Sequence, residues 1–284
     1  MSVELARPAT VDEAVRILDE SEGEGKLIAG GTAVVLMMRQ GLISPPLLVS
    51  MQDVQGMTGI DRSDGHLRIG AQATLGAVAS SKLVKLHAPA LAHACDVVGN
   101  IRVRNAATLA GNLAEADYAS DPPSMLTCLG ATCSVQGPDG SRTLPISELI
   151  TGFYSTSLGP AEVITEVSVP EARPGERAAY LKYVSRSSED RPCVGVAARA
   201  LIADGAVKEM NVVIAGVAGT PAVAPQACEI GIGRPLEDGA IADVAEGHAD
   251  SIDPMEDARG SAWYRTQMIR VFVTRALQTL REPA

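Results

Sequence analysis

The chain has 284 residues, of which 46% are hydrophobic and 20% charged, a composition typical of globular proteins with a sizeable core. Lys and Arg together number 24 against 34 Asp and Glu, so the formal net charge is −10. Such a charge excludes DNA or RNA as an expected partner, because a polyanion is repelled by an acidic surface without a basic run.

The spacing of cysteine, histidine and apolar residues indicates which kinds of site and cellular location to expect. The five cysteines are never spaced as CxxC, and the four histidines show no HxxxH or HxH spacing, so we expect buried free thiols and no metal site. No apolar run reaches the ~18 residues that a membrane span needs. The first residues also lack the basic start and apolar core of a secretory signal. We therefore expect a cytoplasmic protein without a transmembrane segment.

The first 56 residues predict a small β-α-β lobe. Thr10 and Glu13 stand in capping-box positions at the start of an amphipathic pattern. Two apolar strands joined through a glycine turn and a helix in so short a stretch are typical of a parallel unit. The expected elements are a helix after Thr10, a strand at 26–29, a helix at 33–40 and a strand at 47–50.

Residues 57–172 predict a mixed α/β region. Gly137 and Gly140 bound a hairpin turn signal between two alternating segments. The stretch 103–121 is polar and rich in Gly and Ala, without a clean period of either kind. The expected elements are strands at 67–70, 131–136, 141–146 and 163–169, and helices at 74–85, at 86–98 and after Pro123.

Residues 173–284 predict an antiparallel three-stranded sheet followed by helices. The expected strands lie at 179–184, 194–202 and 207–217, and a turn at 203–205 joins the last two. Asp253 is expected to cap one of the helices, with Pro254 at its first position. The fold class is therefore α+β, with a small β-α-β lobe, a mixed middle lobe and a C-terminal sheet with helices.

The turn at 29–32 is the first candidate binding site. Gly30 and Gly31, between a strand and a helix, would let the backbone approach a bulky anion, and free N–H groups there favour a phosphate. Thr32 adds a hydroxyl donor. A plain tight turn explains the same residues. Because the segment is neither GxGxxG nor a P-loop, a Rossmann or nucleotide-hydrolase function is excluded.

The segment 108–112 is the second candidate. It again combines small residues with donors, here the Thr108 hydroxyl and the Asn112 amide, although a packed turn between sheet elements would look the same. Two such loops in adjacent lobes suit a ligand with two phosphates. The pair therefore predicts a dinucleotide cofactor held by its pyrophosphate between the lobes.

Two further groups could border such a cofactor. Asp121, whose geometry is restricted by the proline that follows, could accept hydrogen bonds from ribose or ribityl hydroxyls, or could cap the helix beginning at Pro122. On a strand, Tyr180, Lys182 and Arg186 would share one face. That face could border an anionic or redox-active ring, or could be a solvated sheet surface.

Four motifs occur in order over about the first 200 residues. They are Ala29-Gly-Gly-Thr32, Val103-Arg-Asn-Ala-Ala-Thr-Leu-Ala-Gly-Asn112, Ser120-Asp-Pro-Pro123 and Tyr180-Leu-Lys182 with Arg186. This set resembles the FAD-binding (medium) subunit of molybdenum hydroxylases, the class of carbon monoxide dehydrogenase and xanthine dehydrogenase. That family carries A-G-G-T/H-x-L, I-R-N-x-A-T-x-G-G-N, S-D-x-P-P and Y-x-K-x-x-x-R. Ala110 stands where the family has a glycine.

The resemblance implies which residues bind FAD. Both loops would wrap the pyrophosphate, mostly through backbone N–H groups, and Asp121 would hold cofactor hydroxyls. Ile164 would line the flavin or adenine pocket, Lys182 would lie near the isoalloxazine ring, and Tyr180 or Tyr183 would shield a ring face. The cofactor-binding residues implied in this way are Leu27, Ile28, Ala29, Gly30, Gly31, Thr32, Ala33, Val34, Thr108, Leu109, Ala110, Gly111, Asn112, Asp121, Ile164 and Lys182.

Fold, domains and partners also follow from the resemblance. It implies the FAD-binding fold of the vanillyl-alcohol-oxidase/molybdopterin dehydrogenase type, with an N-terminal FAD-binding lobe (1–56), a middle FAD-binding lobe (57–172) and a C-terminal domain (173–284). In this class, molybdopterin on a large subunit oxidises the substrate and iron–sulfur clusters on a small subunit relay the electrons. The chain would carry FAD as an electron-transfer subunit in a dimer of heterotrimers and reduce an external acceptor. None of its own residues need be catalytic.

Two alternatives stay open at the level of sequence. A self-contained FAD oxidoreductase of the same fold would need acid or base residues facing the flavin, and we find no convincing histidine or paired-carboxylate set. A flavin-free scaffold subunit is favoured by Ala110 and disfavoured by Thr108, Asn112, Asp121 and Lys182. Flavin content would separate the scaffold from both enzymes, and co-purifying partners would separate the subunit from the lone enzyme.

Overall fold

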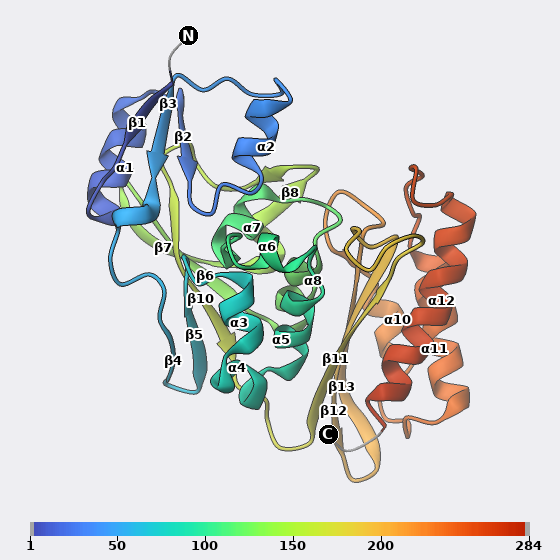
Figure 1. Ribbon diagram of the computed structural model, residues 1–284. Helices are drawn as coiled ribbons and strands as arrows, with labels where there is room; N and C mark the ends of the chain where they lie inside the picture. The colour runs from blue at the N-terminus through green and yellow to red at the C-terminus, as the bar shows by residue number, and fades with distance from the viewer. Residues whose placement is uncertain (1–2, 282–284) are drawn as a thin grey trace.

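The N-terminal lobe is built on a three-stranded parallel sheet. The computed structural model describes residues 3–281 and places strand β3 between β1 and β2 (Figure 1). Thr10 caps α1 as expected, accepting from the Glu13 N–H at 3.1 Å, whereas the Glu13 side chain accepts from the Ala9 N–H at 2.8 Å, one residue before the N–H that a capping box would use. The expected β-α-β unit is confirmed, with β1 as an additional edge strand. The elements are β1 (Glu4–Ala6), α1 (Val11–Glu20), β2 (Gly25–Ile28), α2 (Val34–Arg39), β3 (Leu47–Ser50) and the 3-10 turn η1 (Met51–Asp53).

A five-stranded antiparallel sheet in the order β4-β5-β10-β6-β7 forms the middle region. The predicted hairpin at Gly137 and Gly140 is confirmed. Its strands are β4 (Ile60–Ser63), β5 (His66–Gly70), β6 (Thr132–Gly137), β7 (Gly140–Pro145) and β10 (Val163–Pro170), and a separate small sheet holds β8 (Ile150–Gly152) and β9 (Ser155–Thr156).

Helices of the middle region differ from the prediction in two places. The single helix expected at 74–85 is two helices, because the backbone at Ser81 is extended and its side chain caps the second one. The aperiodic stretch 103–121 contains short helices, capped by Asn100 and Thr108, that are too brief to show a period. The helices are α3 (Leu75–Ser80), α4 (Lys82–His87), α5 (Pro89–Asp96), α6 (Ile101–Arg104), α7 (Leu109–Glu115), α8 (Asp121–Leu129) and α9 (Ile146–Leu149).

The C-terminal region is an antiparallel sheet covered by helices. The three long strands are confirmed, and a two-residue strand, β14, extends the sheet at the β13 edge. The helix start expected at Asp253 and Pro254 is wrong: the Met255 N–H bonds the Val217 carbonyl, and the helix begins later, capped by Ser261. The elements are β11 (Glu176–Tyr183), β12 (Val194–Ala203), β13 (Ala206–Ala215), β14 (Ala222–Val223), α10 (Pro225–Glu229), α11 (Asp238–Ser251) and α12 (Ala262–Thr279).

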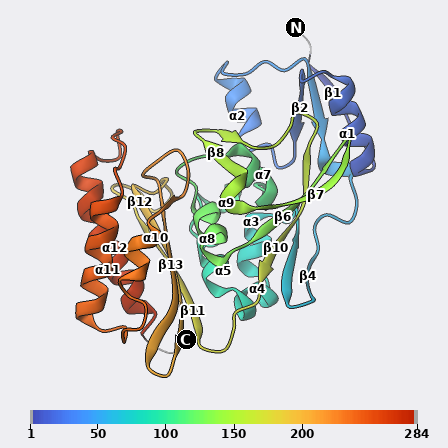
Figure 2. The same ribbon diagram turned by 180° about the vertical axis from the view of Figure 1, so that it is seen from behind.

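Helices cover both faces of this C-terminal sheet. Tyr180, Ala197 and Val213 pack with the core of the middle region, whereas their strand neighbours Val196 and Val212 belong to a second core with α11 and α12. Figure 2 shows the sheet between α5 and α8 on one side and α11 and α12 on the other. Because successive strand residues alternate between faces, β11 both completes one core and contributes to the other.

The cysteines are buried, as the sequence predicts. All five cysteines are buried and free of disulfide bonds. Among residues 3–281, no helix combines the length and the apolar character that crossing a membrane requires.

Candidate cofactor site

The two glycine-containing loops meet at Gly30. This residue follows β2, and a Cβ built on it would overlap the carbonyl oxygen of Ala106, in the turn that leads to the second loop. The next residue, Gly31, has a φ of +70°, a conformation that glycine adopts without strain. The structure therefore brings together two loops that are far apart in the sequence, and only a residue without a side chain allows this contact.

The backbone donors of the first loop have no partner in the part of the chain that the structure describes. Within residues 3–281, the N–H groups of Gly30, Gly31, Thr32 and Ala33 make no hydrogen bond, and neither does the Thr32 hydroxyl. Gly30 and Thr32 are exposed. Successive unpaired N–H groups in a tight turn form an anion-binding concavity. The donor set thus fits the phosphates of a dinucleotide.

The backbone donors of the second loop are already in use. The N–H groups of Leu109 and Ala110 donate to carbonyls of the segment before α3, at 2.9 and 3.2 Å. Those of Gly111 and Asn112 donate to the Thr108 hydroxyl and the Thr108 carbonyl, at 3.1 and 2.9 Å. The backbone of the second loop is therefore held by hydrogen bonds within the protein. The donors that it can still offer a ligand are the Thr108 hydroxyl hydrogen and the Asn112 amide nitrogen.

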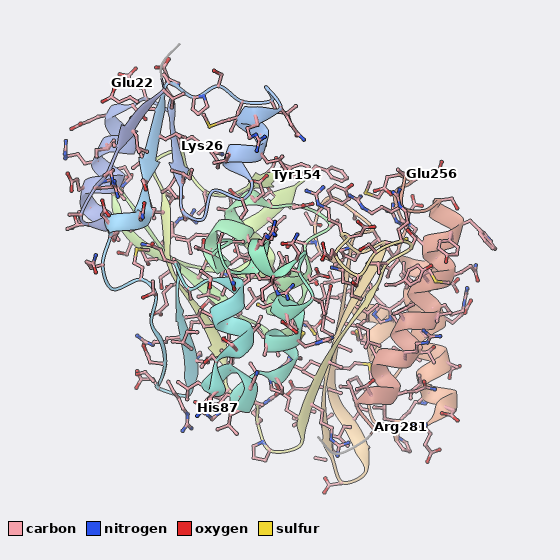
Figure 3. All side chains as sticks on the ribbon, in the orientation of Figure 1. Glu22, Lys26, His87, Tyr154, Glu256 and Arg281 are labelled. Atoms are coloured by element: carbon pink, nitrogen blue, oxygen red, sulfur yellow. The ribbon has the colours of Figure 1, made fainter. Side chains whose placement is uncertain are left out.

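A buried carboxylate lies between the middle region and the C-terminal sheet. Asp121, at the start of α8, is 2% exposed. Its Oδ1 accepts from the Tyr180 hydroxyl at 2.7 Å, and its Oδ2 accepts from Lys182 Nζ at 2.9 Å. Figure 3 shows that side chains fill the space between α8 and the sheet. The interpretation of Asp121 as the cap of α8 is wrong, because Ser120 holds that position. The interpretation of the Tyr180–Lys182 face as a solvated sheet surface is also wrong, because both side chains are buried against Asp121.

Burial sets the protonation behaviour of this cluster. It raises the pKa of Asp121 to about 6, although the Lys182 ammonium and the Tyr180 hydroxyl both act to lower that pKa. Burial also raises the pKa of Tyr180 well above its ordinary value, so the phenol stays protonated and donates. A carboxylate with two fixed donors presents its remaining lone pairs in a defined direction.

Comparison with known proteins identifies the family. The protein-family model described as the FAD binding domain in molybdopterin dehydrogenase matches residues 1–172, more than half of the chain. The chain belongs to this family. A second model, the CO dehydrogenase flavoprotein C-terminal domain, matches residues 179–280.

Individual members of the molybdopterin dehydrogenase family match over almost the whole chain. Subunit alpha of the 6-hydroxypseudooxynicotine dehydrogenase complex of Paenarthrobacter nicotinovorans is 32% identical, covering 94% of this chain and 90% of that protein. The carbon monoxide dehydrogenase medium chain of Afipia carboxidovorans is 28% identical, over 100% and 98%. The structure of carbon monoxide dehydrogenase from Hydrogenophaga pseudoflava superimposes with a TM-score of 0.95 at 30% identity, over 99% and 98%.

These matches confirm several expectations for this molybdopterin dehydrogenase family member. The resemblance to the medium subunit, the α+β FAD-binding fold and the FAD cofactor are confirmed. The chain is a flavoprotein subunit of the molybdenum hydroxylase class, and its relatives are oxidoreductases that work in multi-subunit complexes. The individual residues assigned to FAD stay a prediction.

The remaining residues expected to bind FAD lie at different depths. Leu27 and Ile28 are half-buried in β2, and Val34 is the buried first residue of α2. Ile164, at the β-bulge of β10, is 5% exposed. Tyr183 lies on the other face of β11, against Tyr264 and Phe272, and exposed Arg186 follows the end of that strand. The structure thus joins Tyr180 and Lys182 to Asp121 and does not join Tyr183 or Arg186 to it.

Sequence reasoning missed two groups that hold this site together. The Val97 carbonyl accepts a second hydrogen bond from Lys182 Nζ, at 2.8 Å. Gly195, which pairs with Lys182 across β11 and β12, leaves room for the Tyr180 hydroxyl, because a Cβ there would overlap it. Only the second carries a sequence signal, a glycine inside an apolar strand, which often marks a close approach.

Proposed function

We propose that the chain is the FAD-carrying electron-transfer subunit of a molybdenum hydroxylase. It would take electrons from iron–sulfur clusters of a partner subunit and pass them to an external acceptor, with FAD supplying the electron-carrying chemistry. The main support within the chain is the first loop, whose four N–H groups have no partner among residues 3–281 and lie beside the second loop at Gly30. A pyrophosphate needs clustered donors of this kind.

The residues would divide the work of holding FAD. The first loop would bind the pyrophosphate through its backbone, and the Thr108 and Asn112 side chains would add donors from the second loop. Asp121 would accept hydrogen bonds from cofactor hydroxyls, and Lys182 would lie near the isoalloxazine ring. Leu27, Ile28, Ala29, Val34, Leu109, Ala110 and Ile164 would form the walls. No residue would act as acid, base or nucleophile on the organic substrate.

The proposal also covers the partner subunits and the domain boundaries of the chain. The partners would be a small subunit with iron–sulfur clusters and a large subunit with molybdopterin, in a dimer of heterotrimers. The chain itself would divide at 56/57 and 172/173 into two FAD-binding lobes and a C-terminal domain. The cytoplasmic location stays a prediction.

Visible absorption of the full chain, purified alone and from its source cells, tests the proposal. We expect flavin bands from the lone chain, or their appearance with one equivalent of added FAD. We expect additional iron–sulfur absorbance and co-purifying subunits from source cells. A colourless complex that added FAD does not reconstitute would instead identify a scaffold subunit, and flavin without partners would identify a self-contained flavoenzyme.

A further inference from the structure

A charged cluster interrupts the apolar interface between α8 and the C-terminal sheet. Asp121 belongs to the segment matched by the FAD-binding family model, whereas Tyr180 and Lys182 belong to the segment matched by the C-terminal one. Both donors to the carboxylate therefore come from outside the FAD-binding segment. Burying a charge is costly unless it is paired and hydrogen-bonded, and Tyr180 and Lys182 supply both bonds. An apolar contact between α8 and the sheet would not need these donors, so packing alone does not account for the cluster.

The tyrosine is held more tightly than packing alone requires. The residue is 2% exposed, and its hydroxyl occupies space that exists only because residue 195 has no side chain. The Lys182 ammonium is fixed from two sides, by Asp121 and by the Val97 carbonyl. With both donors fixed, the Asp121 carboxylate has one orientation.

We propose that Tyr180 is a positioning residue of the FAD site, whose hydroxyl orients the Asp121 carboxylate and so couples FAD binding to docking of the C-terminal domain. The inference rests on the proposed function, in which Asp121 accepts hydrogen bonds from cofactor hydroxyls. An oxygen that accepts from the tyrosine still has a second lone pair for the cofactor. Because coupling is reciprocal, FAD should stabilise the docked sheet as much as docking strengthens FAD binding.

The charges around Asp121 make the proposed role of Tyr180 testable through the pH dependence of FAD affinity. Tyr180 and Lys182 on β11 contact the carboxylate directly. The charge of Asp117, before α8, raises the pKa of Asp121, and the charge of Asp121 raises the pKa of Cys95 on α5. The tyrosine hydrogen bond stabilises the ionised form, so its loss raises the pKa of Asp121 further. FAD affinity that depends on the ionised carboxylate falls on acidification, and without the hydroxyl it should begin to fall at a higher pH.

FAD titration of the full chain tests the proposal, comparing Tyr180→Phe with Tyr183→Phe. The control removes a hydroxyl from the same strand, where it contacts Tyr264 instead of Asp121. We expect Tyr180→Phe to weaken FAD binding about tenfold at neutral pH, more on acidification, because a buried charge-assisted hydrogen bond is lost. The control should stay within about twofold, as expected for a site remote from the ligand. Adding Tyr180→Phe to Asp121→Asn should change FAD affinity little further, since the tyrosine acts through the aspartate.

Each outcome separates this inference from the proposed function. If the wild-type chain does not bind FAD, the proposed function fails. If the wild type binds FAD and a folded Tyr180→Phe chain binds it equally well at every pH, the positioning role is overturned. Should that variant fail to fold, hydrogen exchange of the wild-type chain decides: FAD must slow exchange of β11 and β12 amides, and unchanged exchange would overturn the coupling.

Discussion

The two glycine loops of this chain look alike in sequence and differ in the use of their backbone. In the first, the N–H groups of residues 30–33 have no partner within residues 3–281. In the second, the N–H groups of residues 109–112 all donate to protein oxygens. The comparison shows that a small-residue motif can serve either to expose donors or to permit close packing.

Position in the fold explains the difference. The first loop follows the end of β2 and leads into the short, partly exposed helix α2, and Gly30 and Thr32 within the loop are exposed. The second loop lies against the segment before α3, where Thr74 and Thr108 form an isolated β-bridge. The first loop can therefore adapt to a ligand, whereas the second fixes the surface against which the ligand lies.

Breaking the contact between the two glycine loops should cause the largest loss of FAD affinity. Gly30→Ala places a methyl group against the Ala106 carbonyl, and backbone cannot yield as a flexible side chain can. We expect FAD affinity to fall at least about tenfold, the equivalent of ~1.4 kcal/mol, because the free N–H groups move away from the second loop. FAD titration by flavin fluorescence measures this.

Gly59→Ala is the matched control for that change. A Cβ at Gly59 meets nothing within 4 Å, so FAD affinity should stay unchanged. If Gly30→Ala binds FAD as Gly59→Ala does, the junction of the two loops is not the phosphate site.

Removing a cap from the second loop should have an intermediate effect. Thr108→Ala deletes the hydroxyl that accepts from the Gly111 N–H, and loss of such a cap costs ~1 kcal/mol in the free energy of unfolding. Thr74→Ala deletes an equivalent cap at the start of α3, also at 3.1 Å. Urea unfolding should show similar losses for both variants.

FAD binding then distinguishes the two threonines. We expect Thr108→Ala to weaken FAD binding a few-fold and Thr74→Ala to leave it unchanged, because only Thr108 belongs to the loop opposite the first. Equal FAD affinity in both variants would show that the second loop supports the site without contacting the cofactor.

Sequence patterns predicted most of the fold and the identity of the two loops. Strands with clear alternation, such as 163–169, and a helix with an N-cap such as Thr10 carry their signal locally. The helices within 103–121 did not, because each is only one or two turns long and is held by caps and tertiary contacts. The helix expected at Pro254 failed because a tertiary hydrogen bond from Met255 competes with helix formation.

The use of each donor could not be predicted in the same way. Nothing local distinguishes the N–H of Gly31 from that of Ala110; the difference lies in a carbonyl from another segment. Likewise, the spacing of Tyr180 and Lys182 predicted a shared face, whereas their joint contact with Asp121 depends on how the sheet docks against α8. Motifs of this kind name the residues of a site, and tertiary structure assigns their roles.

The smallest effect is expected at Ala110, where the family has a glycine. Its N–H already donates to the Ala71 carbonyl at 3.2 Å, and the residue is 8% exposed, so the methyl group points into packed surroundings and does not withhold a free donor. Ala110→Gly should therefore leave FAD affinity within about twofold and lower the free energy of unfolding by ~1 kcal/mol, the usual cost of glycine in a helix.

Ala114→Gly makes the same change at an exposed position of α7 and so measures helix propensity alone. Any extra loss of stability in Ala110→Gly reports the buried methyl group. If Ala110→Gly instead strengthened FAD binding about tenfold or more, the second loop would have a ligand-facing amide that the alanine obstructs. The two loops would then share one binding mode, and the division between a free loop and a committed loop would be wrong.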